Sequence, residues 1–85
     1  MKEYQDVQKN VADNIKRVRT NKGLSQLEFA KQFGFKSATA ISLIESNQRG
    51  VPIGLLWRIS KFSGYSIKDF LLKGIIPANP KRIGE

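Results

Sequence analysis

One stretch constrains the fold more than any other: from Leu24 to Arg49, two short helical patterns flank a glycine turn. Ser25 is a favourable helix N-cap, and Glu28 three residues later completes the pattern of a capping box. The apolar residues that follow share one helical face: Phe29, Ala30 and Phe33. Gly34 should end this first helix, because glycine readily adopts the positive φ that a helix C-terminus often requires.

A second helix is expected after the turn, from Ala38 to Ser46, with Ser37 as its N-cap. Ile41 and Ile44 lie nearly one turn apart and mark its buried side. Other side chains project away from the core: Thr39, Ser42 and Leu43. The pattern therefore predicts a helix with an outward face that is available for binding.

Helical patterns flank this pair on both sides. Before it, an apolar stripe repeats at three- and four-residue steps: Val7, Val11, Ile15 and Val18. After Pro52 a fourth helix should end at Gly64, and its apolar residues are Leu55, Leu56, Ile59 and Phe62. The last helix should begin at the Ser66 cap, with Asp69 as its capping-box partner. The predicted fold class is all-α, a compact bundle of about five short helices.

A chain of 85 residues has room for one small core. We assign residues 1–73 to the helical domain and residues 74–85 to a C-terminal tail, in which Pro77 and Pro80 oppose a helix. The tail is expected to be either flexible or in contact with a second copy of the chain. Three apolar residues near its start either cover the core or meet that second copy: Leu72, Ile75 and Ile76.

The charge of the chain indicates its partners. Lys and Arg number 15 against 7 Asp and Glu, giving a formal net charge of +8, which favours polyanions such as nucleic acid. On charge alone, a basic protein without such a partner is equally compatible, because charge reports on association and not on fold.

Cysteine and histidine are absent from the chain. Their absence removes disulfides, thiolate nucleophiles, the usual zinc ligands and the side chain with an unperturbed pKa near neutrality. The carboxylates are scattered, so we expect neither an enzyme nor a metal or cofactor site. No apolar stretch approaches the roughly 20 residues of a membrane span, and we expect a cytoplasmic protein without a membrane partner.

Taken together, the patterns resemble the helix-turn-helix of the phage-repressor and Cro-like family of DNA-binding proteins, over roughly residues 11–71. The matching residues are Ile15 to Arg19, Gly23 to Gln26, Phe29-Ala30, Phe33-Gly34, Ile41-Ser42, Ile44-Glu45, Pro52 and Ser66 to Leu71. Compared with the family, the turn holds an extra residue, most simply Lys36, and the fourth helix starts about one residue early. The resemblance implies a lambda-repressor-like domain with residues 38–46 as the recognition helix.

The resemblance also implies roles for individual residues. Those expected to contact DNA are Gln26, Lys36, Ser37, Ala38, Thr39, Ser42, Leu43, Ser46, Asn47, Gln48 and Arg49. Residues 46–49 fall where the loop of the family touches the DNA backbone, and Gln26 would reach a phosphate or support the recognition helix. Arg19 and Glu45 would form an ion pair between the first and third helices, with a solvated cation as the alternative for Arg19. Asn47 tolerates the left-handed conformation that a helix C-terminus often needs.

The recognition face has no Arg, Asn or Gln for bidentate contacts with guanine or adenine. Thr39 and Ser42 can donate or accept hydrogen bonds, whereas Ala38 and Leu43 can pack on thymine methyl groups. Specificity is therefore expected to depend on thymine contacts and DNA shape, with Lys36 or Arg49 at phosphates or in a narrow minor groove.

The expected function is sequence-specific binding of double-stranded DNA by a transcriptional regulator, a repressor acting as a homodimer on a pseudo-palindromic operator. Candidates for the dimer contact are Trp57, Phe70, Leu72, Ile75 and Ile76. Packing within one chain is an equal alternative for these residues. A rival function is a protein-interaction module of the same fold, antitoxin-like or binding a regulatory partner protein, with weak or no specific DNA binding. The weak base-reading face favours this rival, whereas the charge and residues 47–49 favour DNA.

Overall fold

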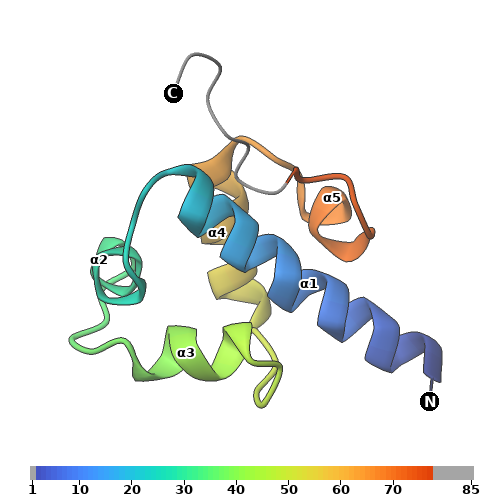
Figure 1. Cartoon of the computed structure of the whole chain (residues 1–85), viewed down its shortest axis with the longest axis horizontal. Coiled ribbons are helices and arrows are strands. Elements are labelled where there is room, and N and C mark those ends of the chain that lie inside the picture. The colour runs from blue at the N-terminus through green and yellow to red at the C-terminus, as the bar shows by residue number, and fades with distance from the viewer. Residues whose placement is uncertain (1, 78–85) are drawn as a thin grey trace.

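The computed structural model of the chain describes the backbone of residues 2–77 and the side chains of residues 6–77. Between residues 2 and 77 there are five helices and no strand (Figure 1). Their bounds are Lys2–Asn21 for α1, Gln26–Gln32 for α2, Thr39–Glu45 for α3, Ile53–Ser63 for α4 and Ile67–Leu71 for α5. The predicted all-α fold is confirmed.

Capping boxes set the beginnings of α2 and α5. At α2, the Ser25 hydroxyl accepts a hydrogen bond from the Glu28 N–H at 3.0 Å, and the Ser25 N–H donates to the Glu28 carboxylate at 2.8 Å. Ser66 and Asp69 form the same reciprocal pair at α5. Both predicted boxes are confirmed, so side chains satisfy backbone N–H groups that the helices leave without partners.

Helix α4 begins directly after Pro52, as predicted, whereas the beginnings of α1 and α3 differ from the sequence pattern. α1 is already helical at Lys2, ahead of the apolar stripe that starts at Val7. α3 is preceded by Ala38 at the cap position, without a side-chain cap. Ser37, the predicted N-cap, accepts only a long hydrogen bond of 3.4 Å from the Thr39 N–H. Because that distance lies beyond the usual range for N–H···O bonds and Ala38 holds the cap position, the prediction of Ser37 as the N-cap was wrong.

Every helix contributes to one apolar core. A fully buried side chain comes from each of them in turn: Ile15, Phe29, Ile41, Ile59 and Phe70. Three rings pack edge to face with centroids 5.0 to 5.9 Å apart: Phe29, Phe33 and Phe62. In Figure 1, α1 runs through the middle of the molecule, and it packs against both α3 and α5. α1 therefore joins the helix-turn-helix pair to the C-terminal part of the domain.

Residues 72–77 continue past α5 as a segment that we call the C-terminal strap. The Asn14 side chain of α1 is buried and holds the junction between α5 and the strap. Its amide nitrogen donates to the Phe70 carbonyl at 2.8 Å and to the Leu72 carbonyl at 2.9 Å. A buried amide with two carbonyl partners fixes the path of the chain, because an unsatisfied buried donor would cost free energy.

Further donors on the same face of α1 hold the strap along its length. The Arg17 guanidinium donates to the Ile76 carbonyl at 3.0 Å, and the Ile76 side chain is fully buried. Asn21 donates to the carbonyl of Pro77 at the far end of the strap, and Asn10 donates to the carbonyl of Leu71, the last residue of α5. Packing therefore continues past the predicted boundary at residue 73, at least to Ile76. Residues 78–85 of the predicted tail lie outside the described residues.

Candidate nucleic-acid interface

The candidate interface is the outward face of α3, with the turn before it and the loop after it. The isoleucines of α3 are buried in the core, so the opposite side of the helix faces solvent. On that side Thr39 and Ser42 are exposed, whereas Ala38 and Leu43 are half-buried. The hydroxyl groups are thus open to a partner, and the apolar side chains are open to it in part.

Residues 46–49 form a tight loop after α3, and all four are exposed. Asn47 has a φ of +61°, so its predicted left-handed conformation is confirmed. The Gln48 N–H donates to the Leu43 carbonyl at 3.0 Å, which closes the end of α3. The Gln48 side chain donates to the Ser46 hydroxyl at 2.8 Å. These bonds present the next residue, Arg49, beside the end of the helix.

A buried ion pair fixes α3 to α1. Arg19 Nε donates to Glu45 Oε2 at 2.7 Å and Nη2 donates to Oε1 at 3.0 Å, a bidentate geometry. The side chains are only 12% and 4% exposed. Arg19 Nη1 also donates to the Leu24 carbonyl at 2.8 Å, in the link between α1 and α2. The predicted Arg19–Glu45 pair is therefore present and joins three segments.

Gln26 completes the support of α3. Its side-chain amide donates to Glu45 Oε1 at 3.1 Å from the first residue of α2. Of the two roles that the resemblance implied, the contact agrees with support of the recognition helix. The carboxylate of Glu45 thus receives donors from both α1 and α2, which holds the end of α3 at a defined place.

The helix-turn-helix region presents little free negative charge. Between Asp13 and Asp69 the carboxylates are those of Glu28 and Glu45. Glu45 is paired with Arg19. The hydrogen bond from the Ser25 N–H, followed by one from the Ser25 side chain, lowers the pKa of Glu28 below its ordinary value of 4.5. Exposed cations, including Lys36 in the turn and Arg49 in the loop, therefore determine the local potential.

The dimer candidates divide into two groups. Phe70 and Ile76 have no exposed surface, so their side chains pack within the core of their own chain, the alternative that the sequence left open. The other three are exposed, by 53% for Trp57, 42% for Leu72 and 45% for Ile75. Lys61 Nζ lies 5.5 Å from the centre of the Trp57 ring, within the range of a cation–π contact.

Sequence reasoning missed the polar face of α1 that holds the strap. Its members follow one another at helical spacing: Asn10, Asn14, Arg17 and Asn21. That spacing could have indicated a polar stripe beside the apolar one. It could not have indicated the backbone carbonyls that accept the bonds, because those lie more than fifty positions further along the chain.

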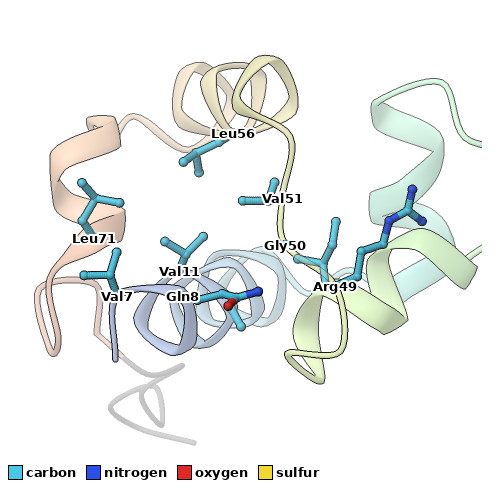
Figure 2. Close-up of a pocket in the computed structure, with 10 residues that line it drawn as sticks. Val7, Gln8, Val11, Arg49, Gly50, Val51, Leu56 and Leu71 are labelled. Carbon is cyan, nitrogen blue, oxygen red and sulfur yellow. The ribbon is translucent and has the colours of Figure 1, made fainter. Parts of the chain in front are cut away.

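Residues 2–77 contain neither a metal-binding cluster nor a membrane span, but they do enclose a pocket. No cluster of three or more potential ligands among His, Cys, Asp and Glu could hold a metal ion there. No helix of that part is both long enough and apolar enough to span a membrane. A pocket of about 180 Å³ does lie behind α3, lined by residues of α1, α4 and α5 (Figure 2).

A helix-turn-helix family model matches residues 15–70, which is most of the chain. The chain belongs to this Cro-like helix-turn-helix family. The predicted membership is confirmed, and with it the general character of a DNA-binding regulatory domain. No curated protein and no solved structure matches the chain.

Proposed function

We propose that this Cro-like helix-turn-helix protein binds a specific double-stranded DNA site through α3 and represses transcription there as a homodimer. The observation that carries the proposal is the fixed position of α3, with Glu45 held by Arg19 of α1 and by Gln26 of α2. The major groove admits one α-helix, and base reading requires that helix to be presented at a constant angle. The buried Arg19–Glu45 pair would keep α3 at such a constant angle.

Base reading is assigned to the exposed face of α3. Thr39 and Ser42 would exchange hydrogen bonds with base edges, and Ala38 and Leu43 would contact thymine methyl groups. Since this face lacks side chains for bidentate contacts, part of the specificity would come from the shape and flexibility of the DNA. A·T-rich half-sites are therefore expected.

Phosphate contacts are assigned to the segments at both ends of α3. Lys36 and Ser37 precede the helix, and residues 46–49 follow it, so a backbone strand on either side of the groove would be within their reach. Each phosphate that a cation neutralises releases condensed counterions, so affinity should fall as salt rises. Gln26 is assigned to the support of α3, since its amide already donates to Glu45.

The dimer follows from the small size of the module. A single domain of this kind buries little DNA surface, and two copies on a pseudo-palindrome would combine their contacts. The two α3 helices would then lie about 34 Å apart, one turn of the duplex. Trp57, Leu72 and Ile75 are the exposed apolar residues that we propose for the contact. A monomeric mass by light scattering at high concentration, together with binding of a single copy to DNA, would contradict a dimer.

Selection from random double-stranded DNA tests the function directly. The expected result is an A·T-rich pseudo-palindrome with half-sites about 10 base pairs apart, bound more weakly as salt rises. A G·C-rich consensus under α3 would contradict the thymine contacts. If no sequence is enriched and the protein shows no salt-dependent affinity for random DNA, the protein-interaction alternative would replace this function.

A further inference from the structure

The pocket behind α3 has the size and lining of a ligand site. It lies between α1, α4, α5 and the loop that follows α3, and its wall is mostly apolar. Figure 2 shows the side chains of Val7, Val11, Val51, Leu56 and Leu71 gathered around a common space. Its volume is about 180 Å³. An apolar cavity of roughly 150 Å³ can hold benzene, so a single ring or a short branched chain would fit here.

The polar side chains at the margin of the pocket indicate which head group it would accept. They are Gln8 and Arg49, and no carboxylate among residues 6–77 lines the pocket. The Gln8 amide nitrogen lies 3.5 Å from the place that a Cβ on Gly50 would take, so its donor group is close to the loop. Arg49 is exposed and points away from the centre of the pocket in Figure 2, so pairing with a bound anion would require a change of its side-chain rotamer. A margin with a cation and an amide complements an anion.

The pocket also touches the parts of the chain that would contact DNA. Ile44 of α3 forms part of its wall, on the buried side of the helix that carries the recognition face. Arg49 belongs both to the margin of the pocket and to the loop assigned to phosphates. A molecule in the pocket would therefore interact with α3 from behind and compete with DNA for the Arg49 side chain.

We propose that this pocket binds a small carboxylic acid with one ring or a short branched chain, and that this binding weakens the hold on DNA. The apolar body lies between Val11, Leu56 and Leu71, and the carboxylate pairs with Arg49 and accepts a hydrogen bond from Gln8. The guanidinium is then withdrawn from the DNA backbone. The effect on DNA rests on the proposed function, whereas binding of the acid does not.

Benzoate is the probe for the first experiment, which uses the free protein without DNA. A titration followed by amide NMR should give saturable shifts at Val7, Gly50 and Leu71, with a Kd on the order of 1 mM for a ligand of this size. Benzamide, which lacks the charge, should bind more weakly, and benzylamine should not bind. Shifts that do not saturate, or that map to amides remote from the pocket, would overturn the proposal.

Adjacent leucines provide matched variants. Leu71 lines the pocket and Leu72 does not, although both are partly exposed. Leu71→Phe should fill the space and weaken benzoate binding by at least about tenfold, whereas Leu72→Phe should leave it unchanged. Val7→Phe fills the space from α1, beside Leu71 in Figure 2, and replaces Leu71→Phe if that variant fails to fold. Equal affinities of both filling variants and the wild type would overturn the assignment of the site.

Two further experiments test the role of the Arg49 charge and the identity of the molecule that occupies the pocket. Arg49→Gln should weaken binding of benzoate but not of benzamide, because only the carboxylate uses the guanidinium. If the amides of the pocket shift with protein concentration in the absence of benzoate, and benzoate does not reverse this shift, a second copy occupies the pocket and the proposal fails.

The last experiment tests whether binding of benzoate in the pocket changes the affinity of the protein for DNA. Saturating benzoate should weaken DNA binding by the wild type and have no effect on DNA binding by Leu71→Phe. Unchanged DNA affinity of the wild type would overturn the regulatory part of the proposal. If benzoate binds in the pocket and DNA does not bind at all, the ligand site stands, the regulatory part falls, and the proposed function fails.

Discussion

At the scale of single residues, Glu45 determines how α3 is held. Its carboxylate is almost completely buried and receives hydrogen bonds from Arg19 and Gln26. Removing a carboxylate from water costs several kcal/mol, and the two donors offset that cost. When its cation is removed, a buried carboxylate still carries the free-energy cost of desolvation, but it has lost most of the interactions that offset this cost.

Arg19→Ala should therefore lower the free energy of unfolding by about 3 kcal/mol. Lys16→Ala is the matched control, because Lys16 is an exposed cation of the same helix, and its loss should remain within about 0.5 kcal/mol. Urea unfolding followed by circular dichroism measures both values. Equal and small losses would mean that the ion pair makes no net contribution to stability.

Arg49 is the residue at which phosphate binding can be measured most simply. Arg49→Gln should weaken binding to all DNA sequences by a similar factor and reduce the slope of log affinity against log salt by about 1. Fluorescence anisotropy at several salt concentrations gives that slope. Lys68→Gln, an exposed cation of α5, should leave the slope unchanged. An unchanged slope for Arg49→Gln would remove this residue from the interface.

At the scale of elements, the cap of α2 makes a prediction about pH. The hydrogen bonds from Ser25 lower the pKa of Glu28 in the folded state. The ionised carboxylate therefore stabilises the folded protein above its ordinary pKa of 4.5, and this contribution is lost as the pH falls through the lowered folded value. Glu28→Gln keeps an acceptor for the Ser25 N–H but removes the charge.

The expected result is a wild type with a higher Tm than Glu28→Gln at about pH 6.5, and a difference that narrows by about pH 3. Thermal unfolding of both proteins at the two pH values is the measurement. Gln32→Ala, at an exposed position of the same helix remote from its capping carboxylate, serves as a control. A difference that stays constant or widens on acidification would show that the charge of Glu28 does not stabilise the cap.

Local sequence predicted the elements well because their causes are local. Ser25 and Ser66 meet their capping partners three residues away, and Asn47 is of a residue type that tolerates the left-handed conformation found there. The beginning of α3 was less predictable. There the Ser37 hydroxyl makes only a long bond, and the first turn of α3 depends on the packing of Ile41 and Ile44 in the core.

At the scale of the whole molecule, the C-terminal strap places two neighbouring isoleucines in different environments. Ile76 is fully buried, whereas Ile75 is nearly half exposed. Ile76→Ala should lower the free energy of unfolding by about 2 to 4 kcal/mol, because it leaves a cavity in the core. Ile75→Ala should change it by less than about 0.5 kcal/mol in the monomer. Chemical unfolding at low protein concentration measures both, and similar losses would contradict the packing of the strap.

The sequence could not distinguish these isoleucines, because spacing near the end of the chain does not reveal which side chain reaches the core. The same limit applied to Phe70, which was a candidate for the dimer contact and lies fully buried. For the site, the Arg19–Glu45 pair was predicted from the family resemblance, since its partners are 26 positions apart. The pocket behind α3 was not predicted, because segments from Val7 to Leu71 meet only in the folded chain. The DNA contacts themselves stay predictions.

The hydrogen bonds from Asn14 to the junction of α5 and the strap also affect how the protein folds during its synthesis. These bonds join positions 56 and 58 residues apart, and synthesis proceeds from the N-terminus. Before Asp69, Phe70 and Leu72 have left the ribosome, the buried amide of Asn14 has no carbonyl to bind, although α2 and α3 are complete. A nascent chain that exposes residues 1–68 should therefore be cleaved by protease, and one that exposes residues 1–77 should resist. The proposed DNA-reading helix α3 is synthesised early, but the fold that holds it becomes stable only when the strap has left the ribosome.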